Sequence, residues 1–231
     1  SNPLPPPTTN PQTNTTHANP KPTNTAIAAT QSHLTSKDCL NSDDILIFIT
    51  LFKHSFPLAA GLLDPLTHPL PRPTPLTLTT PNLQLINVNN NHWVATRITR
   101  SASPPDIRIQ IADSIAGELY SPTHITEARA TCQRLYGAQI NPTTPTQVLN
   151  VHQQQERILA NDTYTDCGLC TIANTAAWLL DIDPTYLAYT QNDLRAALLA
   201  CIAPSTITIE PLLQFIRDSN PRPPRNPPPT S

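Results

Sequence analysis

Apolar residues along the chain recur with two different periods, and each period predicts one type of secondary structure. Residues 40–52, LNSDDILIFITLF, begin with polar residues that can cap a helix. Apolar residues then follow at helical intervals, namely Ile45, Leu46, Ile49 and Phe52. Together with similar patterns further along the chain, this predicts helices over residues 40–52, 124–137 and 189–202.

A period of two, typical of strands, follows a long irregular segment. Residues 57–81 contain seven prolines, which favour an irregular connection over the surface. Residues 83–88 and 91–98 are then predicted to be strands. Residues 106–113, DIRIQIAD, alternate strictly, so their three isoleucines share one face of a third strand.

A further apolar segment, CGLCTIANTAAWLL, covers residues 167–180. Its apolar residues lie at intervals of three and four, which is typical of a helix: Leu169, Ile172, Ala173, Ala176 and Leu180. The pattern predicts a buried helix that begins at or near Cys167.

The composition limits the class of protein. Residues 1–32 and 217–231 are rich in Pro, Thr and Asn, so we expect disordered tracts on either side of one folded domain, residues 33–216. The net charge is -2 and the basic residues form no block, which argues against nucleic-acid binding. No apolar run is long enough for a signal peptide or a membrane span, so we expect no membrane insertion.

The cysteines and the ends of the chain suggest where the protein works. Five cysteines at irregular spacing argue against a disulfide framework and favour a reducing compartment. We therefore expect an intracellular monomer, cytoplasmic or nuclear, or inside the host cell if the protein is viral. The chain has no methionine and starts at Ser1 in a Pro-rich tract, so we expect a piece cut from a longer polyprotein of a virus or mobile element.

Cys167 is a candidate nucleophile because of its place at a helix N-terminus. Backbone amides and the helix dipole at that end stabilise a thiolate, so its pKa is expected to fall. Gly168 leaves room beside the sulfur, where a substrate carbonyl could approach and a backbone amide could face an oxyanion.

Three other interpretations of Cys167 and Cys170 remain open: core packing, a redox pair, or half of a zinc site. Core packing would be preferred if no other residue supported catalysis. A redox pair normally follows a strand in a thioredoxin-like pattern, and none precedes this one. A zinc site would need a second pair of ligands, whereas His152, Cys132 and Cys201 are isolated, so we expect no metal and no cofactor.

His92 is the histidine with the most suitable position for a base. It opens the strand over residues 91–98 and shares a face with Val94, Thr96 and Ile98. The other histidines lie in or beside the extended tract, flank prolines, or, like His124, begin a helix.

Asp113 ends the alternating strand on the face of the isoleucines, an unusual position for a carboxylate without a partner. If the strands form a hairpin around residues 100–105, one register places His92 directly opposite Asp113, with Cβ atoms about 4.5–5.5 Å apart. Alternatively, His92 is structural and Asp113 begins a turn with Ser114. The occurrence of both residues at matching ends of one hairpin favours an imidazole oriented by a carboxylate.

These residues carry a resemblance to a known family. In their order and separation, His92-Trp93, Asp113-Ser114 and Asp166-Cys167-Gly168 resemble the ubiquitin-like-protein proteases, which include the SUMO (sentrin-specific) proteases. Adenovirus protease and the acetyltransferase effectors are distant relatives of that group. Residues 40–52 and 189–202 resemble the helix before the catalytic core and the closing helix of these enzymes.

The resemblance implies an α+β, papain-like fold of the SUMO-protease and adenovirus-protease type, with a central mixed sheet flanked by helices. It implies a cysteine endopeptidase or isopeptidase with Cys167 as nucleophile, His92 as general base and acid, and Asp113 as the residue that orients it. The family's oxyanion glutamine corresponds to Asn161, which carries the same amide donor on a shorter arm. Alternatively, Gln155 or Gln154 could take that role.

The resemblance also bears on the substrate. Family members that process a Gly-Gly tail hold it between two tryptophans. In this chain Cys39 stands at the first of these positions and Trp93 at the second. Plain packing of Trp93 against the sheet is an equal alternative to a role in substrate binding. We expect a looser cleft and two candidate partners, ubiquitin or a ubiquitin-like modifier and the parent polyprotein. An inactive binding module or an acetyltransferase on the same fold is the alternative, although the three lysines offer little for a coenzyme A pocket.

Overall fold

The centre of the protein is a five-stranded sheet in the order β1-β2-β3-β4-β5. The computed structural model describes residues 21–70, 74–78, 82–100, 107–115, 122–151 and 166–221. Its strands are β1 (Ala60–Gly61), β2 (Asn82–Val88), β3 (His92–Arg100), β4 (Ile107–Asp113) and β5 (Thr146–Asn150). The three strands predicted from alternation are β2, β3 and β4.

The sheet is mixed. Strands β2, β3 and β4 form an antiparallel meander, whereas β1 pairs parallel with β2, and β5 pairs parallel with β4. A second, two-stranded sheet joins β6 (Ile202–Ala203) to β7 (Thr206–Ile207).

The register of β3 and β4 differs from the prediction by two residues. Ala95 pairs with Ala112, whereas the predicted register pairs it with Gln110. The strands continue to Arg100 and Ile107, so the connection spans residues 101–106, one residue further along the chain than expected. A shift by an even number preserves the faces of a strand, so His92 and Asp113 remain on one side as diagonal neighbours.

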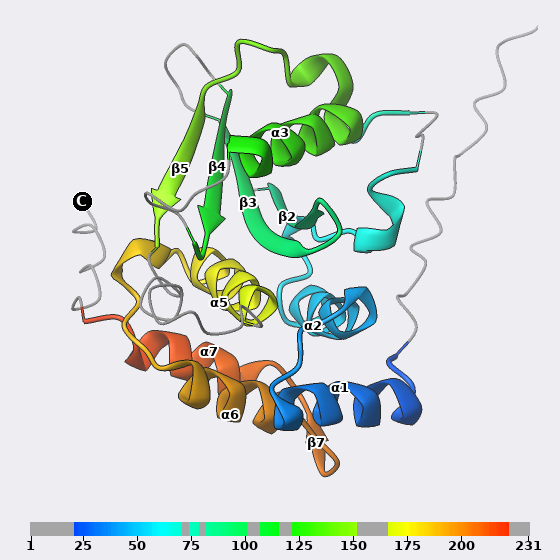
Figure 1. The fold of residues 1–231 in the computed structure, drawn as a ribbon, viewed down its shortest axis with the longest axis vertical. Coiled ribbons are helices and arrows are strands. Elements are labelled where there is room, and N and C mark those ends of the chain that lie inside the picture. Colours follow the sequence, from blue (N-terminus) through cyan, green and yellow to red (C-terminus); the bar gives the residue numbers. More distant parts are fainter. Residues whose placement is uncertain are drawn as a thin grey trace, which may run out of the picture.

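The described residues form six α-helices, which lie in layers on the two sides of the sheet (Figure 1). They are α1 (Asn24–Ser36), α2 (Ser42–Ser55), α3 (Pro122–Tyr136), α5 (Cys167–Leu179), α6 (Gln191–Cys201) and α7 (Glu210–Asp218). Short 3-10 turns, η1 (Pro65–Thr67), η2 (Gly137–Gln139) and η3 (Pro184–Tyr186), complete the described elements. In Figure 1, α3 lies beside the upper part of the strands, α5 and α2 lie below them against the opposite face of the sheet, and α1, α6 and α7 form the outermost layer. No described helix has both the length and the apolar character needed to cross a bilayer.

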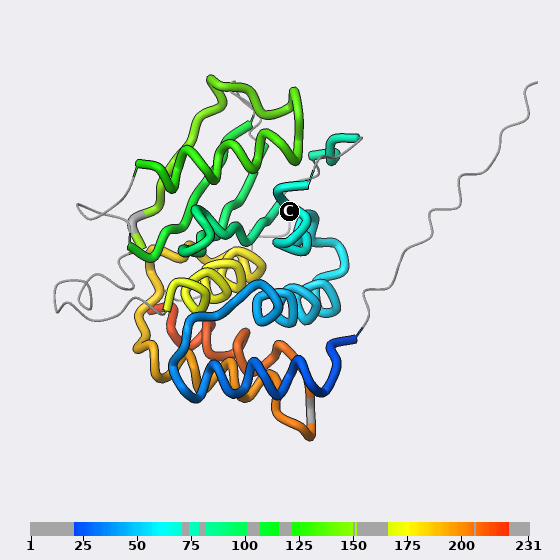
Figure 2. The backbone as a smooth tube through the Cα atoms, turned by 45° about the vertical axis from the view of Figure 1, so that its right-hand side comes forward, coloured from blue at the N-terminus to red at the C-terminus, as the bar shows by residue number. Residues whose placement is uncertain are grey.

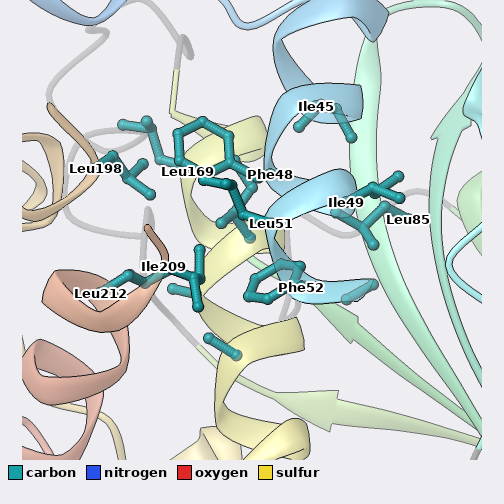
Figure 3. Close-up of a cluster of buried hydrophobic side chains, with 14 of the residues drawn as sticks. Ile45, Phe48, Ile49, Leu51, Phe52, Leu85, Leu169, Leu198, Ile209 and Leu212 are labelled. Atoms are coloured by element: carbon teal, nitrogen blue, oxygen red, sulfur yellow. The ribbon is translucent and has the colours of Figure 1, made fainter. Parts of the chain in front are cut away.

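Each face of the sheet has its own apolar core. Val94, Ile98, Ile109 and Ile111 pack with α3, on the face that carries His92. On the opposite face, a larger core joins Trp93, Ala95 and Ala112 to the inner sides of α2, α5, α6 and α7. Figure 3 shows its centre, where side chains of α2 meet those of α5 and the chain around α7, including Phe48, Phe52, Leu169 and Ile209.

Among the described helices, α5 is the most enclosed. Every residue from Cys167 to Trp178 is buried, because the sheet covers one side and α2, α6 and α7 surround the rest. Most of its side chains are apolar, as is expected for a helix in such a position, and Thr171, Asn174 and Thr175 are buried polar exceptions. The predicted start at Cys167 agrees with the structure.

Helix α1 corrects the predicted start of the folded domain. Residues 24–32 were expected to belong to the extended N-terminal tract, yet they form the first two turns of α1, with Ile27 and Thr30 buried. The helix is fixed by Asp44 at the start of α2, which accepts hydrogen bonds from Thr30 Oγ1 at 2.5 Å and from His33 Nδ1 at 2.9 Å. Figures 1 and 2 both show α1 alongside α6, on the side of the molecule away from α3.

Candidate active site

The predicted histidine and aspartate meet at one end of the central strands. His92 is the first residue of β3 and Asp113 is the last residue of β4, so an antiparallel pairing brings them together. His92 Nε2 lies 2.8 Å from Asp113 Oδ1. Their side chains are 8% and 0% exposed, so the pair is shielded from water.

A third residue, His124 in the first turn of α3, completes this cluster. Its Nδ1 lies 3.3 Å from Asp113 Oδ2, the carboxylate oxygen that His92 does not contact. The rings of His92 and His124 are stacked, with centroids 4.6 Å apart and planes inclined by 21°. The Ile115 backbone N–H also donates to Asp113 Oδ1, at 3.0 Å. Sequence reasoning set His124 aside; the available signal was its place at the start of a helix predicted to follow the strand that ends at Asp113.

The Asp113 carboxyl is held in its ionised form. Burial alone raises its pKa, but hydrogen bonds from His124 and His92, the positive potential of His92 and the Ile115 amide outweigh it. Together they lower the pKa of Asp113 from 3.8 to about 2. A carboxylate in this state only accepts hydrogen bonds, so Nε2 of His92 carries the proton in their contact.

Cys167 lies at the start of α5, next to the backbone of β3 where Trp93 follows His92. Cys167 is 4% exposed, and burial raises the pKa of its thiol to about 11. The backbone N–H groups of Trp93 and Gly168 act in the opposite direction without cancelling that effect. The predicted fall in pKa is therefore wrong, because desolvation of the buried sulfur exceeds the stabilisation available at the helix end.

Gly168 and Trp93 both contact the chain just before α2. A Cβ atom built on Gly168 would lie 2.9 Å from Leu40 Cβ, so the glycine lets α5 approach this segment closely. The Trp93 indole Nε1 donates to the Leu40 backbone oxygen at 3.0 Å, and the residue is 3% exposed. Trp93 thus packs in the core; contacts of Trp93 or Gly168 with a substrate stay predictions. Cys39, next to Leu40, is exposed and lies close enough for its charge to act on Cys167.

Cys170 differs from Cys167 in its surroundings. It is fully buried, and desolvation together with the nearby Asp166 charge raises the pKa of its thiol far above the ordinary value. Its side chain is within hydrogen-bonding range of Tyr189 and Ser114. Both cysteines are free thiols, and in the described ranges neither belongs to a group of three or more metal-ligand side chains.

Asp166, immediately before Cys167, forms a buried ion pair with Arg195 of α6. Their side chains are 0% and 5% exposed. Arg195 also donates to the Leu34 backbone oxygen at 3.4 Å, so one guanidinium joins α1, α6 and the start of α5. The candidates for the oxyanion site, Asn161, Gln155 and Gln154, lie outside the described residues.

Comparison with known proteins supports the fold class. No protein-family profile and no curated protein sequence matches the chain. Among solved structures, the chain is similar to one described as "SUMO protease Ulp1 with the catalytic cysteine oxidized to a sulfenic acid", with a TM-score of 0.52 and 15% sequence identity. The match covers 80% of this chain and 97% of that one. The chain therefore has the fold of a SUMO protease, with a mixed sheet flanked by helices, which confirms the predicted fold class.

Proposed function

We propose that this protein is a cysteine protease that hydrolyses peptide or isopeptide bonds, with Cys167 as nucleophile. The observation that carries the proposal is the buried His92–Asp113 pair at 2.8 Å, beside the β3 backbone that also contacts the Cys167 sulfur. The likeness to a SUMO protease adds that the fold can support this chemistry.

The first step follows from the protonation states of the three groups. The thiol of Cys167 rests protonated because burial raises its pKa to about 11. Nε2 of His92 donates to the ionised Asp113, so Nδ1 is the nitrogen left to accept a proton. In the proposed reaction, Nδ1 takes the thiol proton while sulfur attacks the substrate carbonyl carbon.

The later steps use the same groups in reverse. The imidazolium, stabilised by Asp113, gives its proton to the leaving amine as the carbon–nitrogen bond breaks, which leaves a thioester on Cys167. Water then attacks the thioester carbon with His92 as base, and the thiol and the carboxylic acid product are released. In the proposed reaction the Gly168 amide, which lies within hydrogen-bonding range of the sulfur, donates to the developing oxyanion.

For the substrate, we propose the C-terminal tail of ubiquitin or a ubiquitin-like modifier. The support is the similarity to a SUMO protease, at the level of the fold. A segment of a parent polyprotein is the competing substrate, and exposed Cys39 beside the site is the feature that favours a cleft less restricted than a Gly-Gly tunnel.

The test is covalent labelling. The full chain would be incubated with ubiquitin and several ubiquitin-like proteins that carry C-terminal propargylamide, and adducts would be detected by intact mass. We expect one adduct at Cys167 that Cys167→Ala abolishes. Cys170→Ala, the matched control on the same helix, should keep most of the labelling and hydrolysis. An adduct that survives in Cys167→Ala, or equal loss in Cys170→Ala, would contradict the assignment.

A further inference from the structure

The Asp113 carboxylate lies between two stacked imidazoles, and only one of them has a role in the proposed reaction. Oδ1 contacts His92 at 2.8 Å and Oδ2 contacts His124 at 3.3 Å. The His124 side chain is 11% exposed, so it is shielded nearly as well as that of His92. This low exposure shows that His124 is not an ordinary solvent-exposed residue of the helix surface.

Metal binding is the first alternative for two histidines and an aspartate, and the ring geometry argues against it. A zinc ion lies about 2.0–2.1 Å from a histidine nitrogen, close to the plane of that ring. The two rings are stacked with only 21° between their planes, so the planes do not meet within that distance of both nitrogens. Hydrogen bonding to Asp113 fits the arrangement better than a shared metal ion, because each carboxylate oxygen of Asp113 contacts one of the two histidine rings.

We propose that His124 is a positioning residue, which fixes the Asp113 carboxylate and, through it, the His92 imidazole. The role belongs to the cysteine protease reaction proposed above and rests on that function. In this role His124 acts through Asp113 and His92: it donates to the second oxygen of Asp113 and is stacked on the His92 ring.

The carboxylate needs this second donor because it is 0% exposed. Its oxygens are shielded from water: within the described residues, His92 and the Ile115 amide donate to Oδ1, and His124 donates to Oδ2. Without that donor, the buried and charged Oδ2 would lose its hydrogen bond. The carboxylate would then be expected to rotate toward another donor. Such a rotation would move Oδ1 away from Nε2 of His92.

The start of α3 has a second contact, with the turn that precedes His92. Asn89, in the turn between β2 and β3, donates from Nδ2 to Thr123 Oγ1 at 3.3 Å. Asn89 and Asn90 both have positive φ, 53° and 58°, in the tight turn that leads directly into His92. The turn before His92 and the helix start that carries His124 are therefore connected to each other as well as to Asp113.

Two variants separate the hydrogen bond from the stacked ring. His124→Asn keeps an amide nitrogen near the place of Nδ1 and removes the ring, whereas His124→Phe keeps a ring and removes the donor. Loss of a hydrogen bond to a charged group corresponds to about tenfold to a hundredfold in rate. We expect kcat per active site to fall by that factor in His124→Phe with KM unchanged, and to stay within about threefold of wild type in His124→Asn.

Active-site titration with the best-labelled modifier probe distinguishes this role from a structural one. If His124 only stabilises the fold, the variants will have fewer active sites with normal kcat at each, which would overturn the proposal. Equal loss in the Asn and Phe variants would overturn it too, since the donor would then not be what matters.

A readout without turnover separates this proposal from the proposed function. In the Cys167→Ala background, the ¹³C carboxyl signal of Asp113 reports its ionisation. Since His124 lowers the pKa of Asp113, the signal should titrate at a higher pH in His124→Phe and close to the parent in His124→Asn. If wild type labels no probe, the proposed modifier substrate fails, while this titration still shows whether His124 holds the carboxylate. An unchanged titration in His124→Phe would refute the contact itself.

Discussion

Replacement of Arg195 by methionine should destabilise the fold strongly, because it removes the guanidinium from a buried carboxylate. Asp166 is 0% exposed and Arg195 is 4% exposed, and the two form an ion pair between the start of α5 and α6. Methionine keeps most of the length and the apolar stem of arginine. Removal of one member of a buried ion pair costs about 3–5 kcal/mol, so we expect a loss of that size.

The free energy of unfolding would be measured by urea denaturation of the full chain, followed by circular dichroism. The matched control is Arg217→Met in α7, where Arg217 pairs with Glu210 at 2.8 Å but the side chains are 43% and 62% exposed. A solvated pair of this kind contributes about 0–1 kcal/mol, so the control should lose little. The two variants make the same chemical change and differ in burial.

A double variant, Asp166→Leu with Arg195→Met, tests the cause of the loss. Replacement of a complete buried pair by apolar side chains is often neutral, so the double variant should regain much of the stability that Arg195→Met loses. The reasoning would be refuted if Arg195→Met lost no more than Arg217→Met. It would also be refuted if the double variant were less stable than Arg195→Met, because an uncompensated charge could not then explain the loss.

Three further predictions concern the site. Because the pKa of Asp113 is lowered from 3.8 to about 2, its contribution to stability is complete above about pH 4 and is lost as pH falls to about 2. The contribution is about 2 kcal/mol, and acid denaturation of Asp113→Asn should lack it. In a His92→Ala variant, the rate of Cys167 alkylation by iodoacetamide should rise with pH up to about 11, and a plateau near neutral pH would contradict the buried thiol. Finally, Cys39→Trp should raise kcat/KM for a Gly-Gly tail over bulkier peptides by up to about tenfold, as expected for one aromatic contact, and unchanged ratios would show that Cys39 does not border the cleft.

Local periodicity was enough to predict most strands and the central helix. The alternation in residues 106–113 and the three- and four-residue spacing after Cys167 each reflect which side of an element is buried, so they identified β4 and α5. Because a strand has a period of two, the same pattern placed His92 and Asp113 on one face even though the predicted register was wrong by two residues. The length of the β3–β4 connection, which sets the register, leaves no mark in the pattern.

Features that depend on contacts between distant segments were missed. Helix α1 has little apolar periodicity, and the side chains of Thr30 and His33 find their partner, Asp44, only when α2 packs against it. The position of His124 over Asp113 depends on the packing of α3 on β4, and that of Arg195 beside Asp166 on the crossing of α6 and α5. None of these pairs has a spacing that a helix or strand period can predict.

The error in the Cys167 pKa has the same origin and changes the expected chemistry. A helix N-terminus favours a thiolate locally, but the enclosure of α5 between the sheet and the other helices is a tertiary property with a larger and opposite effect. The two buried acids of the proposed site therefore differ. Asp113 receives side-chain donors from His92 and His124 together with the Ile115 amide and stays ionised, whereas Cys167 receives backbone donors and stays protonated.

This difference decides which group carries the negative charge before substrate binds. With the charge on Asp113 and the proton on sulfur, the proposed attack requires proton transfer to Nδ1 of His92, and the imidazolium would then lie beside a carboxylate that is already ionised. In the proposed reaction, the contacts that keep Asp113 ionised thus stabilise mainly the state in which His92 is a positively charged imidazolium. Weakening them should slow the step in which His92 takes the proton and leave substrate binding unchanged, which is why a fall in kcat at constant KM is the expected signature of His124→Phe.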